Sequence, residues 1–146
     1  MKKYLLVTLL FLSIGLVGCG KKDNGKIIRF FYSYGSYNSG EHVYDIEVKD
    51  EKATIKANGY NGIELNLDKE ISTSYLEKIN NIVKKYDIVS WDKFKKTNYD
   101  VLDGDGFSLI IKFENGKEIA ATGYMKYPKD YKKASKEIQK ILESIK

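Results

Sequence analysis

Hydrophobic and polar residues alternate along several stretches in the first half of the chain. Ile27 to Tyr34 is dense in β-branched and aromatic residues, which favours a strand. His42 to Val48, Ala53 to Ala57 and Ile63 to Leu67 each place apolar residues at every second position. That period is the one a half-buried strand requires, and turn-forming residues separate the stretches. The pattern therefore predicts four consecutive strands.

The hydrophobic period then changes to that of a helix. Apolar residues from Leu76 to Tyr86 recur at helical spacing, and Ser74 with Glu77 fits a capping box at the start. A second apolar stripe runs from Tyr131 to Ile145, with Pro128 suited to its first turn. Two amphipathic helices are therefore expected.

A hairpin is predicted between the two helices. Phe107 to Phe113 alternates again, and Lys117 to Met125 is the return strand. Asn115-Gly116 between them favours a type I′ turn, in which both central residues take positive φ.

This succession of elements predicts the fold class. We expect an α+β domain over residues 27–146, in the order ββββ-α-ββ-α. An antiparallel sheet with both helices packed on one face would bury the apolar side of every element.

The beginning of the chain has a different character. Lys2 and Lys3 precede an almost wholly apolar run from Tyr4 to Gly18, which is shorter than the roughly 20 residues that a membrane-spanning helix needs. A positive start, a short apolar core and small residues at its end are typical of a secretory signal peptide. Residues 1–18 are therefore expected to be a cleaved leader.

The end of the leader carries the only cysteine of the chain. Leu16-Val17-Gly18-Cys19 resembles the lipobox of bacterial lipoproteins. The resemblance implies a diacylglyceryl group on the Cys19 sulfur, cleavage between Gly18 and Cys19, and attachment to the outer face of a bacterial cytoplasmic membrane. An ordinary cleaved signal, or an uncleaved anchor with an incidental cysteine, is the alternative.

Residues 19–26 are expected to join the lipid to the domain. The segment is short, charged and glycine-bearing, so it is typical of a flexible spacer. Fully extended, Gly20 to Lys26 spans about 20 Å. The domain would therefore stay close to the membrane, and with no second cysteine its fold would depend on packing alone.

Charge narrows the choice of partner. Loss of Lys2 and Lys3 with the leader lowers the formal net charge from +5 to +3. The basic residues are lysines except for Arg29, whereas specific nucleic-acid contacts depend on arginine. A nucleic-acid partner is therefore not expected. The lysines between Lys126 and Lys146 favour an anionic membrane or wall polymer, or they form the solvated face of a helix.

The mature part carries a second resemblance. It depends on five short motifs, Trp91-Asp92-Lys93-Phe94, Val101-Leu102-Asp103-Gly104, Asn115-Gly116, Thr122-Gly123 and Tyr127-Pro128, together with the strand at Phe107. Their combination resembles an uncharacterised domain of secreted Gram-positive proteins. The resemblance implies a fold and a location, and it implies no activity, cofactor or catalytic residue.

The loop from Asn98 to Gly106 is the most site-like segment. Asp103, Asp105 and Glu114 occupy the first, third and twelfth places of a calcium-loop template, but residues 107 and 108 break it. A polar turn before a buried strand is the favoured interpretation of the loop. The alternative function is therefore a calcium-binding or carboxylate-dependent catalytic domain that uses Asp100 to Asp105.

Tyrosines supply the other candidate site. The chain has 12 of them, and five are candidates for binding: Tyr32, Tyr34, Tyr37, Tyr124 and Tyr127. Exposed aromatic rings stack on sugar rings or peptide side chains. The competing interpretation places these rings in the core with their hydroxyls reaching solvent.

Enzymatic machinery is hard to assemble from this sequence. His42 is the only histidine, and the only thiol, Cys19, is assigned to the lipid. The chain therefore lacks the residues for a Cys–His catalytic pair and for a zinc site. No nucleophile-elbow or phosphate-cradling glycine motif is present. We therefore expect no catalysis and no cofactor. The predicted function is a non-catalytic, lipid-anchored surface module that binds an envelope polymer or a protein.

Overall fold

The computed structural model of the chain describes residues 24–145. The predicted leader, Gly18 and Cys19 lie outside the described residues, so cleavage and lipidation remain predictions. The elements, in chain order, are β1 (Ile27–Ser36), β2 (Gly40–Lys49), β3 (Lys52–Tyr60), β4 (Asn66–Ile71), α1 (Ser74–Lys85), the 3-10 helix η1 (Ile88–Trp91), β5 (Lys95–Thr97), β6 (Gly106–Phe113), β7 (Glu118–Tyr124) and α2 (Tyr131–Glu143).

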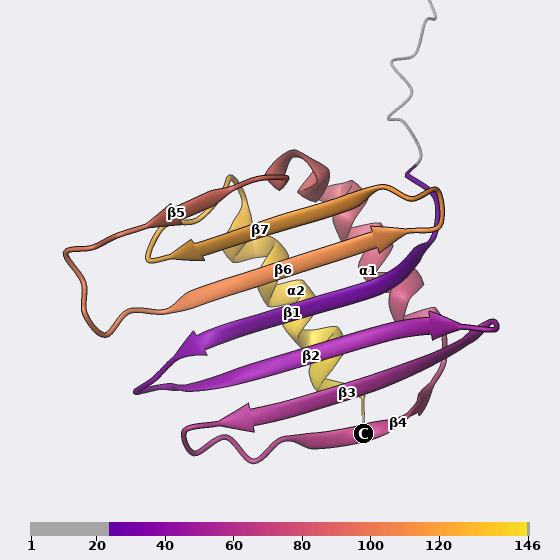
Figure 1. Cartoon of the computed structure of the whole chain (residues 1–146), viewed down its shortest axis with the longest axis horizontal. Coiled ribbons are helices and arrows are strands. Elements are labelled where there is room, and N and C mark those ends of the chain that lie inside the picture. The colour runs from indigo at the N-terminus through magenta and orange to yellow at the C-terminus, as the bar shows by residue number, and fades with distance from the viewer. Residues whose placement is uncertain (1–23, 146) are drawn as a thin grey trace, which may run out of the picture.

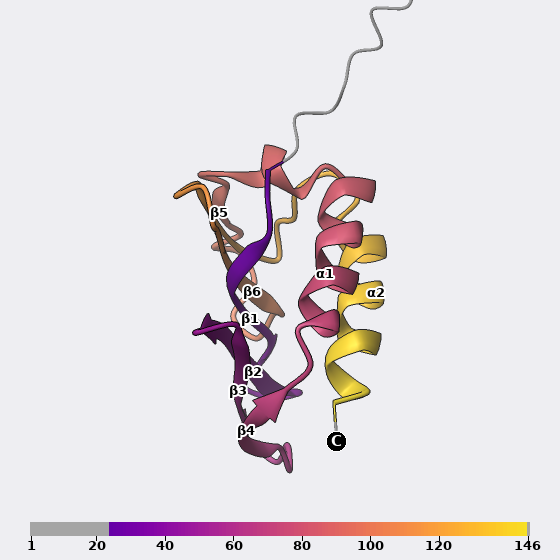
Figure 2. The ribbon, with the colours of Figure 1, turned by 90° about the vertical axis from the view of Figure 1, so that its right-hand side faces the viewer.

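The strands form one seven-stranded sheet in the order β4-β3-β2-β1-β6-β7-β5. Figure 1 looks onto the sheet with the helices behind it. Figure 2 shows the sheet edge-on, with α1 and α2 beside each other on the same side of the strands. The described residues therefore form an α+β fold of two layers, and one face of the sheet is open.

The core lies between these two layers. Along β6, each second residue is buried, from Phe107 to Phe113. The helices meet these strand residues with apolar stripes, which include Leu76, Ile79 and Val83 of α1 and Ala134, Ile138 and Leu142 of α2. Burial of one such Leu or Ile side chain contributes about 1.5–3 kcal/mol. The two hydrophobic periods seen in the sequence therefore face each other across one core.

The prediction of a purely antiparallel sheet is wrong, because β5 pairs in parallel with β7. The predicted order ββββ-α-ββ-α also lacks one strand, β5, which lies between α1 and β6 in the chain. β5 consists of three exposed residues, Lys95 to Thr97, so it shows no apolar alternation. Backbone hydrogen bonds hold it, including Thr122 N to Phe94 O (2.8 Å) and Asn98 N to Tyr124 O (2.9 Å). The remaining strand pairs are antiparallel.

The predicted capping box is also absent. It requires a serine at the N-cap, but Ser74 is already the first residue of α1. Thr73 is the N-cap and makes no side-chain capping bond, while the Ser74 amide donates to Ser72 Oγ at 3.2 Å. Likewise, α2 begins at Tyr131, so Pro128 precedes its first turn.

Two strand predictions differ from the structure at their ends. Four residues, 114–117, separate β6 from β7, and of the pair Asn115-Gly116 only Gly116 takes a positive φ (+84°). The hairpin exists, but its turn is longer than the predicted type I′ turn. The fourth strand begins at Asn66 rather than Ile63, because the chain first turns and the Gly59 amide donates to Leu65 O at 2.8 Å.

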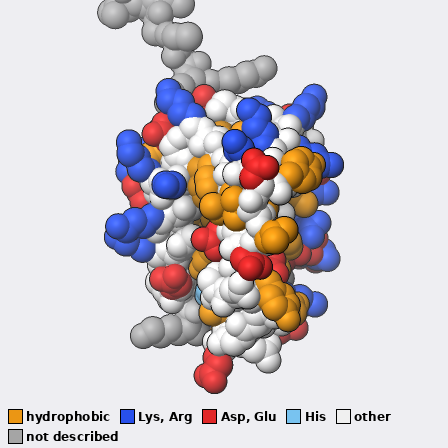
Figure 3. All heavy atoms as spheres, turned by 90° about the vertical axis from the view of Figure 1, so that its left-hand side faces the viewer, with side chains coloured by type: hydrophobic (Ala, Val, Ile, Leu, Met, Phe, Trp, Pro, Cys, Tyr) orange, Lys and Arg blue, Asp and Glu red, His pale blue; other side chains and the backbone are white. Residues whose placement is uncertain are grey.

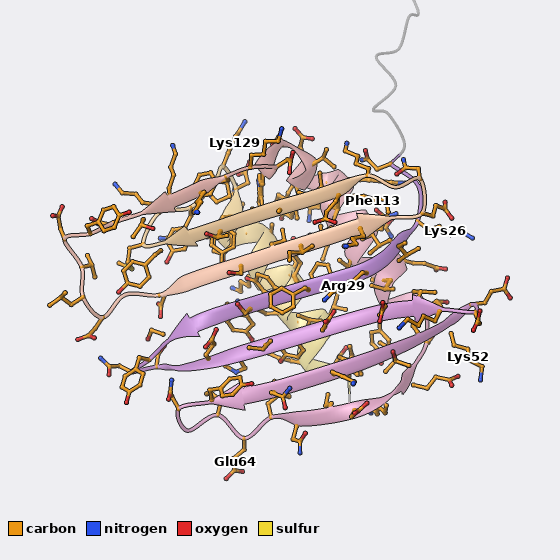
Figure 4. All side chains as sticks on the ribbon, in the orientation of Figure 1. Lys26, Arg29, Lys52, Glu64, Phe113 and Lys129 are labelled. Carbon is orange, nitrogen blue, oxygen red and sulfur yellow. The ribbon has the colours of Figure 1, made fainter. Side chains whose placement is uncertain are left out.

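The open face of the sheet carries ion pairs between neighbouring strands. Arg29 Nε and Nη2 donate to the two carboxylate oxygens of Asp45 at 3.1 and 2.9 Å, near the middle of the sheet (Figure 4). Lys112 Nζ lies 3.0 Å from Glu118 Oε2. These side chains keep contact with water, so this part of the open face is polar and solvated.

The strands give the domain two ends. We call the proximal end the part formed by Asn24, the turns 50–51 and 114–117 and the start of α1; Lys26 and Lys52 mark it in Figure 4. We call the distal end the four connections 37–39, 61–65, 98–105 and 125–130. The 10 residues of β1 run between the ends, which at about 3.3 Å per residue places them roughly 30 Å apart. Within residues 24–145, neither helix is long and apolar enough to cross a membrane.

Candidate binding site at the distal end

Exposed hydrophobic side chains gather at the distal end. The large ones there, with their exposed fractions, are Tyr37 (80%), Tyr60 (52%), Tyr99 (88%), Leu102 (92%) and Met125 (37%). Among the described residues only one other large hydrophobic is exposed, Ile28 near the proximal end (38%). Figure 3 looks at the distal end and shows hydrophobic side chains in several clusters on this face, with polar and acidic groups between them. Five exposed side chains of this kind at one end, against one elsewhere in the described residues, make this end the candidate interaction surface.

Two of the candidate tyrosines hold the distal connections in place. The Tyr124 hydroxyl accepts from the Gly104 amide (2.6 Å) and donates to Leu102 O (2.7 Å). The Tyr127 hydroxyl donates to Asp105 O at 3.0 Å. These bonds fix the segment 98–105 against the segment 125–130, so both hydroxyls have a structural role.

The acidic loop is tied to its neighbours by Asp105. Ser39 Oγ donates to Asp105 Oδ1 at 3.2 Å, which joins the loop to the β1–β2 connection. Asp100 and Asp103 are exposed. In the part of the chain that the structure describes, no group of three His, Cys, Asp or Glu side chains is arranged to hold a metal ion. The geometry supplies one tethered carboxylate rather than a set of converging ligands.

A cavity of about 470 Å³ opens at the distal end. We call it the distal cavity; its lining residues are Tyr34, Gly35, Ser39, Gly40, His42, Asp105, Gly106, Met125, Tyr127, Tyr131, Lys132, Ser135 and Gln139. They come from the adjoining ends of β1, β2 and β6, from three distal connections and from the first three turns of α2. The volume falls within the range of about 300–1,000 Å³ typical of small-molecule sites.

Two stacked pairs of rings form much of the lining. The Tyr34 and His42 rings are 4.6 Å apart and nearly parallel, at 7°. Those of Tyr127 and Tyr131 are 4.8 Å apart at 14°. The Tyr131 hydroxyl lies 3.0 Å from that of Tyr32, which links the lining to the buried core. Such contacts fix the rings, so the aromatic lining is preformed.

Two buried polar atoms in the lining have no hydrogen-bond partner within the protein, the Tyr34 hydroxyl and His42 Nδ1. The Tyr44 phenol lies near enough to affect the pKa of Tyr34, but the two hydroxyls are not in the distance and angle range of a hydrogen bond. Burial is the main cause that raises the pKa of Tyr34, so its hydroxyl keeps its proton. Unpaired buried polar groups are rare in folded proteins, and each calls for an explanation.

The five candidate tyrosines do not form one exposed patch. Tyr32 is 1% exposed, and its hydroxyl pairs with Tyr131 inside the protein, so its assignment to a binding surface is wrong. Tyr32 lies on the same side of β1 as Phe30, and both side chains are in the core. Tyr37 is exposed, whereas Tyr34, Tyr124 and Tyr127 are half-buried. Tyr34 and Tyr127 line the distal cavity, and Tyr37 and Tyr124 do not.

Several residues of the distal cavity were not predicted as site residues. Tyr131, Ser135 and Gln139 lie on α2, where the sequence shows only an amphipathic helix. His42 was considered only as a catalytic group. One signal was available, since Tyr131, Ser135 and Gln139 recur every four residues and thus share one helical face.

Comparison with models of protein families and with curated proteins finds no match to this chain. Membership of a domain family of secreted Gram-positive proteins therefore remains a prediction from the motifs quoted above.

Proposed function

We propose that the chain is a lipid-anchored surface protein whose distal end binds an envelope polymer or a protein without catalysing a reaction. The Leu16-Val17-Gly18-Cys19 boundary supports lipidation of Cys19 and location on the outer face of a bacterial cytoplasmic membrane. The gathering of exposed hydrophobic side chains at the distal end carries the binding role.

The geometry of the domain makes these two parts of the proposal consistent. A lipid on Cys19 would hold the proximal end near the membrane, because Cys19 is only five residues before Asn24. The distal end, roughly 30 Å further along the strands, would then point away from the membrane. The hydrophobic side chains would therefore face the envelope rather than the lipid.

The surroundings of His42 support a non-catalytic role. Its ring is stacked on Tyr34, and its Nδ1 has no hydrogen-bond partner. A histidine that acts as a general base is usually oriented by a carboxylate on its second nitrogen. His42 lacks that orientation on Nδ1.

Fractionation of cells tests the anchoring. Cys19→Ala is expected to release the protein from the membrane or to stall its processing. Retention on the membrane with unchanged processing would contradict lipidation.

Retention on isolated Gram-positive cell walls, and on membranes stripped of the protein, tests the binding surface. The double change Tyr99→Ala with Leu102→Ala removes two of the most exposed distal side chains, which make few packing contacts, so the fold is expected to persist. We expect loss of retention on one of the two materials. Ile28→Ala at the proximal end is the matched control and is expected to retain binding. Equal retention of all three proteins would contradict the proposal.

A further inference from the structure

We propose that the distal cavity binds one sugar unit of a neutral envelope glycan, an inference that builds on the proposed envelope-binding function. Neighbouring units of the same glycan would run over the exposed side chains around the cavity mouth.

The first argument is the composition of the lining. Tyr34, His42, Tyr127 and Tyr131 supply flat ring surfaces, which suit the C–H faces of a pyranose. Gln139 supplies an uncharged amide that both donates and accepts hydrogen bonds. Ser39 and Ser135 donate their hydroxyl protons to Asp105 and to the Lys132 carbonyl, so they supply acceptor oxygens. Sugar hydroxyls are likewise donors and acceptors, so this mixture fits a polyhydroxyl ring better than a purely apolar ligand.

The second argument is charge. Asp105 and Lys132 are the only residues in the lining that carry a fixed charge, and their charges are opposite. The Asp105 carboxylate already accepts a hydrogen bond from Ser39 at 3.2 Å. A strongly anionic or cationic ligand would find no excess of opposite charge, so the lining favours a neutral one.

The third argument is the pair of unpartnered atoms. The Tyr34 hydroxyl and His42 Nδ1 are buried beside the cavity and bond to nothing in the protein. Both atoms are closed to water, so a ligand hydroxyl reaches either of them only when the neighbouring lining moves aside. It would then satisfy a buried polar group whose unpaired state costs free energy. These two atoms give the cavity a directional preference that the rings alone do not provide.

The position of the cavity supports a polymer rather than a free sugar. Ser39 and Met125 belong to both the lining and the exposed distal connections, and Tyr37 follows β1 directly. Tyr37 is 80% exposed. A chain that leaves the cavity thus meets further hydrophobic side chains on the same end of the domain (Figure 3).

Titration of the full-length chain in detergent micelles tests the inference, with triacetylchitotriose and maltotriose as glycan probes and adenosine as a flat non-sugar probe. Backbone amide shifts in two-dimensional NMR locate the contact. We expect at least one trisaccharide to shift the amides of Gly35, Gly40 and Gly106, and adenosine to shift none of them. Adenosine binding in place of both sugars would overturn the sugar assignment, as would shifts confined to other residues.

Tyr34→Phe removes only the unpartnered hydroxyl and is expected to weaken trisaccharide binding about fivefold, the equivalent of one hydrogen bond. Gln139→Met tests a second polar group in the lining and is expected to act in the same direction. Tyr75→Phe, on α1 and outside both the lining and the exposed distal side chains, is the matched control and is expected to bind normally. Unchanged affinity in both cavity variants would overturn the inference.

The two proposals fail in different ways. Cell-wall retention that depends on Tyr99 and Leu102 but survives Tyr34→Phe and Gln139→Met would contradict the cavity assignment alone. Sugar binding in the cavity without retention on any envelope material would contradict the proposed function and support the cavity assignment.

Discussion

The two ends of the domain each contain a cavity, but their linings differ in chemistry. The proximal cavity, of about 400 Å³, is lined by aliphatic residues, by Thr73 and Asn80, and by the charged side chains of Lys26, Glu51, Glu77 and Glu114. Its Asn80 Oδ1 is also buried without a hydrogen-bond partner. The Lys26 amide donates to Glu114 Oε1 at 3.0 Å. The distal cavity has four fixed rings, whereas the proximal cavity has none, and it has two charged side chains where the proximal cavity has four. Volume alone therefore does not separate a binding site from an irregular surface, whereas the lining does.

The ends also differ in how closely the backbone packs. A Cβ on Gly35 would lie 2.1 Å from Gly40 O, and one on Gly59 would lie 2.3 Å from Ile63 O. At the proximal turn, a Cβ on Gly116 would meet nothing within 4 Å. The backbone around Gly35, which lines the distal cavity, is therefore closely packed, whereas the turns at Gly116 and at Gly62 have room for a side chain.

Of the effects predicted for the two ends, the loss of stability at alkaline pH is expected to be the largest. Burial raises the pKa of five tyrosines above the ordinary 10.0, namely Tyr32, Tyr34, Tyr44, Tyr127 and Tyr131. Above pH 10 the unfolded chain loses these protons more readily than the folded one, so the free energy of unfolding falls as the pH rises. Tyrosinate absorbance of the buried rings should therefore appear together with unfolding.

Hydrogen exchange at alkaline pH locates where that loss begins. Three of the five rings line the distal cavity, so the amides near Gly35 and Gly40 should lose protection before those of the turn 50–51. Earlier loss of protection at the proximal turn would contradict the expectation that the distal end opens first.

Gly35→Ala is expected to destabilise the fold by about 3 kcal/mol, the sum of positive-φ strain and a clash with Gly40 O. Gly116→Ala carries the same kind of φ strain without the clash, and about 1 kcal/mol is expected. Urea unfolding of both variants measures the difference. Equal losses of stability would show that the distal backbone accommodates a Cβ at Gly35 as easily as the proximal turn does at Gly116.

Removal of single hydroxyls separates the core tyrosine from the cavity tyrosine. Tyr32→Phe leaves the buried Tyr131 hydroxyl without its partner at 3.0 Å, and a loss of about 1 kcal/mol is expected. Tyr34→Phe removes a hydroxyl that bonds to nothing, so the free energy of unfolding should stay constant or rise. Thermal unfolding compares the two, and a larger loss for Tyr34→Phe would show that its hydroxyl has a structural partner.

Calcium is expected to have the smallest effect. The described residues bring no three metal-ligating side chains together, and Asp105 is engaged by Ser39. The melting temperature should therefore not change on addition of millimolar calcium. A rise that Asp103→Ala abolishes would contradict this expectation and support the alternative function based on the loop Asp100 to Asp105.

The sequence predicted secondary structure correctly wherever one residue pattern is compatible with only one kind of element. The alternation from Phe107 to Phe113 specifies a half-buried strand, and the stripe through Ile138 specifies a helix with one apolar face. The α+β class follows from their succession. β5 could not be predicted, because Lys95 to Thr97 are exposed and are held by backbone hydrogen bonds that carry no side-chain signature.

The sequence by itself determined the two hydrophobic periods, the hairpin at Asn115-Gly116 and the expectation of a lipid on Cys19. Only the tertiary structure decided which tyrosines face the core and which face a cavity. Tyr32 and Tyr34 are two residues apart on the same side of β1, so periodicity assigns them one environment. Tyr32 lies beneath α2, where Tyr131 meets its hydroxyl, while Tyr34 lies where β1 nears its end beside the distal cavity. The pattern along a strand specifies which face a side chain takes, and packing of residues distant in sequence decides what covers that face.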